Sequence, residues 1–159
     1  MNTSSFKIEE RDFAFPFIEP EKTGCGDEEL TFEFNLKTYN NFNGEIQFAL
    51  LEFPNQISYN ISPTSLNSSG TIGTITLNRN ELPYGTYNII LNGAHDNISE
   101  QESFIVNFYP ETVSPPNLLS PENNLSDVNI NQNFEWSNVN YADSYRFELS
   151  TVEDFPKLK

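Results

Sequence analysis

Apolar and polar residues alternate along much of this chain, as they do in β-strands that have one buried face. The alternation is clearest at residues 30–38, where Leu30, Phe32, Phe34 and Leu36 are separated by polar residues. Shorter alternations, bounded by Asn, Gly and Pro, predict further strands at residues 46–50, 57–61, 72–77, 87–91 and 104–108. Residues 12–19 are predicted to form a strand at a sheet edge, because Pro16 and Pro20 cannot donate to a sheet ladder. About seven short strands are typical of a two-sheet sandwich.

Two parts of this pattern are less regular. Residues 21–29 are rich in glycine and charge and are predicted to be a turn. In residues 72–77 both Ile72, Thr74 and Thr76 on one side and Ile75 and Leu77 on the other could face inward, so the buried face stays open.

The pattern also divides the chain. Residues 1–11 are a polar lead-in, and residues 12–108 hold the predicted sandwich. Residues 109–116 contain three prolines and no alternation, which predicts a semi-rigid linker. Residues 117–159 predict three more strands, around Leu118, Trp136 and residues 145–149. Three strands are too few to close a sandwich, so this second unit is predicted to be partial.

A local motif lies just before one of these strands. Residues 82–87 read Leu-Pro-Tyr-Gly-Thr-Tyr, a tight turn followed by a tyrosine at the start of a strand. In Greek-key sandwiches such a tyrosine bonds back to upstream backbone, an arrangement known as the tyrosine corner. We therefore predict structural roles for Leu82, Gly85 and Tyr87. The alternative is that Tyr87 is an ordinary inward-facing strand residue.

The second unit resembles the first half of a fibronectin type III domain. The resemblance covers residues 116–155 and is carried by Pro-Asn-Leu-Leu-Ser-Pro, then Phe-Glu-Trp, then Ala-Asp-Ser-Tyr-Arg-Phe-Glu-Leu-Ser. It implies that Trp136 and Tyr145 pack in the core of that unit.

The first unit resembles the immunoglobulin-like modules that precede such domains in large secreted bacterial proteins. Thr23-Gly24-Cys25 and Gly85-Thr86-Tyr87-Asn88-Ile89 carry this resemblance. Proteins of that kind are often reprolysin-type zinc metallopeptidases or subtilisin-like peptidases with a C-terminal sorting domain. The resemblance implies an immunoglobulin-like Greek-key sandwich followed by a truncated fibronectin type III-like unit. The peptidase motif His-Glu-x-x-His is absent from this sequence.

The charge of the chain narrows the range of partners. Its net charge is −15, with 23 acidic and 8 basic residues, so it should repel nucleic acid and anionic membranes. A single cysteine, Cys25, excludes an intrachain disulfide. The start of the chain lacks the pattern of a signal peptide, and no run is long and apolar enough for insertion into a membrane. We expect an internal segment of a longer exported chain, located outside the cell or at its surface.

Candidate chemistry is sparse. The only histidine, His95, is predicted to lie in a solvated loop, and no Gly-x-Ser-x-Gly elbow accompanies it. We expect no catalysis by this segment and no cofactor. Zinc would need more His or Cys ligands, whereas calcium ligation by residues 27–29, or by Asp96 with Glu100, stays open.

These observations leave two functions. The first is a non-catalytic spacer or interaction module whose partners are neighbouring domains of the same polypeptide. The alternative is a module that binds a cell-surface glycan or protein through strand-end loops, with Tyr39, Phe42 and Tyr84 as ligand contacts. Those three aromatic residues could instead cap the ends of the sandwich.

Overall fold

The computed structural model describes residues 11–151 of the chain. Every regular element in this range is a β-strand, which confirms the all-β class. The described part accordingly holds no helix that could cross a membrane. The chain divides into two compact units between Glu111 and Thr112, within the predicted linker. Each unit is described by itself.

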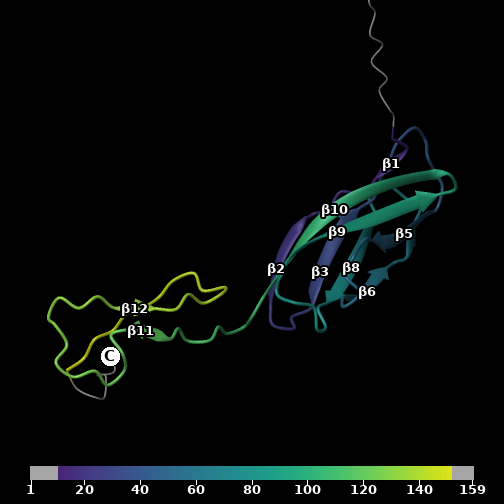
Figure 1. The fold of residues 1–159 in the computed structure, drawn as a ribbon. Helices are drawn as coiled ribbons and strands as arrows, with labels where there is room; N and C mark the ends of the chain where they lie inside the picture. Colours follow the sequence, from purple (N-terminus) through teal and green to yellow (C-terminus); the bar gives the residue numbers. More distant parts are fainter. Residues whose placement is uncertain (1–10, 152–159) are drawn as a thin grey trace, which may run out of the picture. The chain divides into compact units, whose positions relative to one another are not determined.

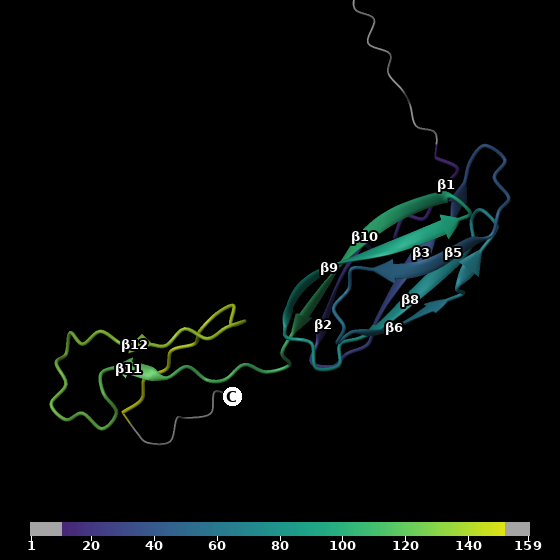
Figure 2. The same cartoon turned by 45° about the vertical axis from the view of Figure 1, so that its right-hand side comes forward.

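Unit 1 is a sandwich of two sheets. One sheet has the strand order β2-β10-β9-β5-β7, the other has the order β3-β8-β6, and a short ribbon pairs β1 with β4. Figures 1 and 2 show these strands as two layers. The bounds are β1 Phe13–Ala14, β2 Glu21–Cys25, β3 Leu30–Asn35, β4 Lys37–Thr38, β5 Ile46–Leu51, β6 Ser58–Ser62, β7 Ser65–Leu66, β8 Ile72–Asn78, β9 Gly85–His95 and β10 Ile98–Tyr109.

The chain crosses repeatedly between the two layers. From β3 it passes to β5, returns to β6, pairs with the larger sheet again at β7, comes back to β8, and then crosses to β9 and β10. Strands that follow one another along the chain therefore lie in opposite sheets of the sandwich at several points.

The core of unit 1 is a layer of phenylalanine rings between the sheets. Phe32 and Phe34 of β3 are fully buried and point toward the opposite sheet. The ring of Phe34 lies 4.8 Å from that of Phe48, and the ring of Phe32 lies 4.6 Å from that of Phe104, centroid to centroid. Phe15 and Phe17, from the segment around β1, fill the space beside them at 5.2 Å from Phe48 and 4.7 Å from Phe104. Burial of each ring is worth about 1.5–3 kcal/mol.

Two inward-facing glycines make room for these rings. Gly73 of β8 lies directly opposite Phe34 of β3. A Cβ atom on Gly73 would come within 2.2 Å of the Phe34 ring, and one on Gly93 of β9 would come within 2.6 Å of the Phe15 ring. The buried face of β8, which the sequence left open, is that of Gly73, Ile75 and Leu77.

The structure differs from the sequence prediction at residues 21–25. They were expected to be part of a turn, but they form β2, which pairs in parallel with β10. The pairing is supported by a side chain: the Asn107 amide donates to the Glu21 carboxylate at 2.8 Å, and Asn107 accepts from Thr86 at 2.7 Å. The partner of β2 lies more than eighty positions away, so no local pattern announces this strand.

Strands β9 and β10 are also longer than predicted. They form a hairpin whose register runs from Phe108 opposite Gly85 to Ile98 opposite His95. Asp96, at the tip, has a φ of 49°. His95 was expected in a loop, but it is the last residue of β9.

Unit 2 contains a single ribbon among its described residues. It pairs β11 (Leu118–Ser120) with β12 (Glu135–Trp136), in antiparallel orientation. The third predicted strand, residues 145–149, is not a strand in the structure. The reason lies in the contacts of that segment, described below.

Gly73→Ala should lower the free energy of unfolding by about 1–3 kcal/mol, because the new methyl group collides with the buried Phe34 ring. Urea denaturation measures the loss. Phe34→Leu on its own should also destabilise the sandwich, but it frees space at the same site. The double variant should therefore lose less than the sum of the two single losses. Strictly additive losses would show that the ring does not press on Gly73.

Candidate functional site

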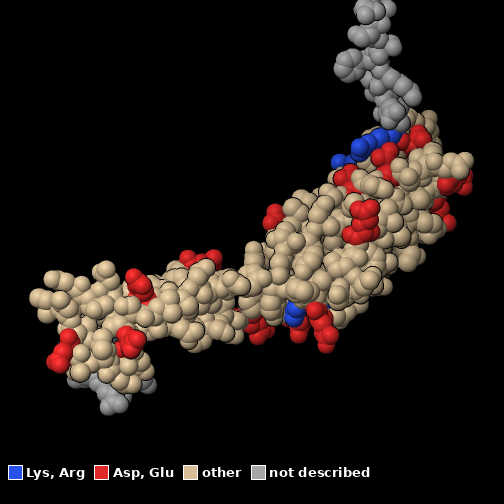
Figure 3. Space-filling model, in the orientation of Figure 1, with Lys and Arg blue, Asp and Glu red and all other residues tan. Residues whose placement is uncertain are grey.

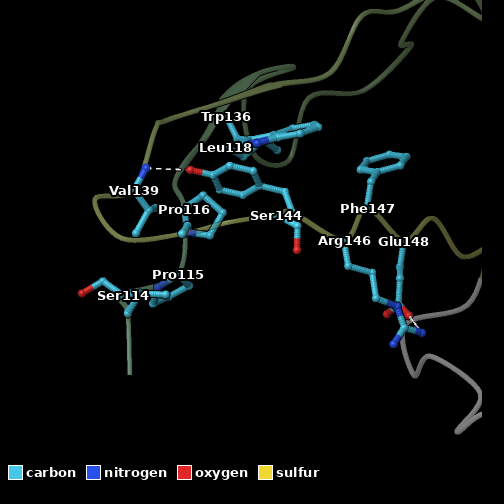
Figure 4. Close-up of a pocket in the computed structure, with 13 residues that line it drawn as sticks. Ser114, Pro115, Pro116, Leu118, Trp136, Val139, Ser144, Arg146, Phe147 and Glu148 are labelled. Atoms are coloured by element: carbon cyan, nitrogen blue, oxygen red, sulfur yellow. Dashed lines mark hydrogen bonds and ion pairs between the residues drawn. The ribbon is translucent and has the colours of Figure 1, made fainter. Parts of the chain in front are cut away.

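Unit 2 carries an open groove of about 590 Å³, within the range of small-molecule sites. Figure 4 shows the residues around it. Its lining is formed by Val113, Ser114, Pro115, Pro116, Leu118, Trp136, Val139, Ala142, Ser144, Tyr145, Arg146, Phe147 and Glu148. All of these belong to unit 2, so the groove is built by this unit alone.

The β11–β12 ribbon forms one wall. Leu118 is directly opposite Trp136, and the ribbon is closed by a reciprocal pair of bonds between Asn117 and Ser137. The Ser137 amide donates to the Asn117 carbonyl at 2.8 Å, and the Asn117 amide donates to the Ser137 hydroxyl at 2.9 Å. These bonds hold the paired backbone of Leu118 and Trp136 next to each other.

The segment 145–149 forms the facing wall through its rings. The ring centroids of Trp136 and Tyr145 are 6.0 Å apart, and the Trp136 and Phe147 rings are 6.2 Å apart and within 10° of parallel. Phe134 also contacts Phe147, at 4.9 Å. The segment thus keeps the alternation that predicted a strand. It contacts the ribbon through these rings instead of lying beside it as a further strand. In the described residues it therefore has no hydrogen-bonded strand partner.

Tyr145 is held at both ends. Its ring packs on Trp136, while its hydroxyl accepts from the Val139 amide at 2.7 Å, the dashed line in Figure 4, and donates to the Asn138 side chain at 3.0 Å. The short loop after β12 is therefore folded over the phenol. The resemblance implied that Trp136 and Tyr145 pack in a core, whereas in this unit the two rings contact each other and each side chain is 37% exposed.

The groove has an apolar wall and a polar rim. Leu118, Phe147 and Leu149 are also exposed, the last of them 75%. Arg146 and Glu148 form an ion pair, and in Figure 4 their side chains lie together, directed away from Trp136. Apolar surface of this kind is normally covered by other protein or by a ligand. The chemistry of the groove is that of binding through ring faces, with charge at one edge.

The hydrogen bond expected for a tyrosine corner in unit 1 is present in the structure. The Tyr87 hydroxyl donates to the Pro83 carbonyl at 2.7 Å, across the turn between β8 and β9. Gly85 has a φ of +154°, a conformation that residues with side chains rarely adopt. Leu82 is buried in the core beneath this turn. These three residues shape the turn and do not form a ligand site.

Arg79 was not singled out in the sequence, but it joins this turn to another. Its guanidinium donates to the Gly26 carbonyl at 2.9 Å and to the Leu82 carbonyl, and it pairs with Asp27 at 2.5 Å. The side chain is only 12% exposed. The signal that could have found it is its place next to the tyrosine-corner motif.

The three aromatic residues proposed as ligand contacts do not form a platform. The Tyr84 ring covers the Arg79 guanidinium at 4.3 Å, at the start of β9. Phe42 packs on Phe13 at 5.3 Å and against the His95 ring at 5.2 Å, at the end of β9. Eleven residues of β9 separate the two places, about 35 Å in an extended strand. Only Tyr39, 45% exposed, keeps an open ring, beside a shallow hollow with Arg11 and Asn40.

His95 anchors the loop before β5. Its Nδ1 lies 2.8 Å from the Glu45 carbonyl, its ring lies against Gly44, and its Nε2 is 3.5 Å from the Asp96 carboxylate. Both nitrogens thus face groups of neighbouring turns. No group of three or more His, Cys, Asp or Glu side chains in residues 11–151 is placed to hold a metal ion. Figure 3 shows acidic side chains scattered over the visible surface and few basic ones.

Known proteins show only partial similarity to this chain. No family model matches the chain, and no curated protein matches it. Among solved structures, the S-layer protein rSbsC is similar over 66% of this chain and 14% of its own, with 15% identity and a TM-score of 0.44. An endo-β-1,4-mannanase from Thermotoga petrophila is similar over 66% of this chain and 21% of its own, with 16% identity and a TM-score of 0.41. The chain therefore spans a small part of each.

Tyr87→Phe should lower the free energy of unfolding of unit 1 by about 0.5–1.5 kcal/mol, because it removes the bond to Pro83 and leaves the ring in place. Chemical denaturation followed by tyrosine fluorescence or circular dichroism measures it. Tyr39→Phe is the matched control, since the Tyr39 side chain is exposed. Equal midpoints for the two variants would show that the corner contributes nothing.

Proposed function

We propose that this chain is a non-catalytic spacer and interaction module of a multidomain secreted bacterial protein. The observation that carries the proposal is the contrast between the two units. Unit 1 has a filled aromatic core, whereas the rings of unit 2 line an open groove. A filled sandwich joined through a proline-rich segment to an uncovered aromatic wall suits a module that holds and docks other domains.

Several features support the non-catalytic part of this proposal. The only histidine of the chain, His95, is occupied by packing on Phe42 and by contacts to Glu45 and Asp96. The groove in unit 2 offers rings, a serine and an ion pair, a set suited to binding.

The proposed parent protein and location of the module rest on the sequence resemblance. The resemblance to immunoglobulin-like and fibronectin type III modules suggests a parent protein of the exported peptidase kind, with this segment as an appendage at the cell surface or outside the cell. The partners would then be neighbouring domains of the same polypeptide. The acidic surface suits this setting, because it favours solubility and disfavours nucleic acid.

We expect strands from outside this chain to cover the exposed rings of unit 2. A chain extended by the downstream sequence should bury Trp136, shift its fluorescence to shorter wavelength and slow amide exchange in residues 112–151. In the present chain these amides should exchange much faster than those of β9 and β10, because few of them lie in a ladder. Hydrogen exchange with mass spectrometry compares the two chains.

Exchange in β9 and β10 is the internal control, since the extension should not change it. A reading frame that offers no further sandwich strands, or an extension that leaves Trp136 as exposed as before, would contradict the proposal. A slowly exchanging unit 2 in the present chain would show that it is a complete small domain.

A second candidate, a carbohydrate-binding module, is favoured by one observation. Trp136, Tyr145 and Phe147 present half-exposed rings next to the polar side chains of Ser144, Arg146 and Glu148. Ring faces suit the apolar faces of sugars, and the polar rim suits their hydroxyls. This candidate places the ligand in unit 2 rather than on Tyr39, Phe42 and Tyr84.

Co-sedimentation with insoluble cellulose, chitin and mannan separates the two candidates. A spacer should remain in the supernatant with all three. A carbohydrate module should sediment with at least one of them, and Trp136→Ala should abolish this binding because it removes the central ring of the groove. Tyr39→Ala, which removes an exposed ring from unit 1, is the control and should sediment like the unaltered chain.

A further inference from the structure

Two Asn-Gly pairs occur in the chain, and the structure places them in opposite settings. Asn43-Gly44 lies in the connection between β4 and β5, just after the turn at Asn40 and Asn41. Asn92-Gly93 lies within β9. In such a pair the glycine has no side chain to shield its own backbone nitrogen. That nitrogen can therefore approach the side-chain amide of the asparagine before it, wherever the local backbone leaves room for the movement.

The first pair is free to make this movement. The Asn43 side chain is exposed, and neither residue of the pair belongs to a strand. Within residues 11–151, the Asn43 side chain forms no hydrogen bond or ion pair, and the Gly44 amide has no hydrogen-bond acceptor. The side-chain amide of Asn43 can thus turn toward the nitrogen of Gly44 without breaking a hydrogen bond.

The second pair is held in place by its neighbours. Strand β9 lies between β5 and β10, so that Gly93 faces Phe48 on one side and Glu100 on the other. Gly93 is also buried. Ladders on both sides keep the backbone of β9 extended and give its amides hydrogen-bond partners. The same dipeptide is therefore open to reaction in one place and protected in the other.

We propose that Asn43-Gly44 is a site of spontaneous covalent modification in the folded chain. The backbone nitrogen of Gly44 loses its proton and attacks the side-chain carbonyl carbon of Asn43, which forms a new C–N bond. The bond from this carbon to the side-chain nitrogen breaks, and ammonia leaves with the proton. The resulting succinimide ring is opened by water at either of its carbonyls. The product at position 43 is aspartate or isoaspartate, and water is the only co-reactant.

The modification alters a loop that is anchored on the residues after it. A Cβ atom on Gly44 would come within 2.6 Å of the His95 ring and 2.7 Å of the Phe42 ring, so the glycine is closely packed. The Glu45 carbonyl lies 2.8 Å from His95 Nδ1, and the Glu45 carboxylate accepts from the Ser65 hydroxyl at 2.6 Å. Isoaspartate adds a methylene to the backbone next to this packed glycine, and both products add a negative charge near Glu45. Modification therefore loosens the loop from the end of β9.

Ageing of the full chain tests the proposal. The folded chain is kept at mildly alkaline pH, where the backbone nitrogen loses its proton more readily, and is digested for mass spectrometry at intervals. The peptide that contains Asn43 should gain the mass difference between an amide and an acid at least about tenfold faster than the peptide that contains Asn92, because a central strand opens rarely. In urea the two rates should become similar. Electron-transfer fragmentation should find both aspartate and isoaspartate at position 43.

Asn43→Gln is the matched variant. It keeps an exposed side-chain amide, but its extra methylene would require a larger ring, which closes slowly. The variant should show no mass gain in this peptide over the same period. Circular dichroism should show a lower thermal midpoint for the unaltered chain after ageing and an unchanged midpoint for the variant. This comparison separates the effect of the modification from other damage during incubation.

Three results would overturn the proposal. The first is an Asn43 that reacts in urea but stays unmodified in the folded chain, because the loop would then be held as firmly as β9. The second is an equal rate for Asn43 and Asn92 in the folded chain. The third is aspartate without isoaspartate, which would indicate direct hydrolysis of the amide. A midpoint that ageing leaves unchanged would contradict the loosening of the loop. The proposal concerns unit 1 and does not rest on the function proposed above.

Discussion

The sandwich of unit 1 depends on the fit of phenylalanine rings between its sheets. Phe32 and Phe34 reach across to Phe104 and Phe48, and this contact fixes the distance between the layers. The rings fit because Gly73 and Gly93 present no side chain where Phe34 and Phe15 lie. A close-packed core of large rings has little freedom to rearrange, so substitutions here are felt by many neighbours. The outward positions carry no such constraint.

The turns at one end of this sandwich are held by polar contacts instead. Arg79 bonds the carbonyls of Gly26 and Leu82, and Tyr87 bonds that of Pro83. These carbonyls belong to turns, where no strand partner is available, so side chains satisfy them. Rigidity at this end therefore comes from a few hydrogen bonds, and the ring of Tyr84 is used to cover the guanidinium rather than to meet a ligand.

Alternation and short motifs predicted most of the strands and turns that depend on residues close together in the sequence. The alternation in β3 and β5 and the motif around Tyr87 can be read from neighbouring residues, because burial repeats every second position. The strand β2 could not be predicted, since its five residues show no clear alternation and its partner, β10, is distant in sequence. The strand predicted at residues 145–149 is absent for a different reason. The alternation there places the apolar side chains on one face but does not say whether a hydrogen-bonding neighbour exists, and in the structure that face is exposed. For the same reason the groove was not predicted, because it results from the contact of Trp136 with Tyr145 and Phe147.

The parallel pairing of β2 with β10 has a mechanical consequence. After β1 and the Phe17–Phe34 bridge the chain enters β2, it leaves the sheet after β10, and these two strands run in the same direction with five residues in register. A force that pulls these two ends apart acts along the strands. It loads the hydrogen bonds of the pair together, in shear, rather than opening them one after another from an end. The Asn107 side chain, bonded to both Glu21 and Thr86, ties a third strand into the same clamp. A pull between the start of β2 and the end of β10 therefore meets this pair in shear.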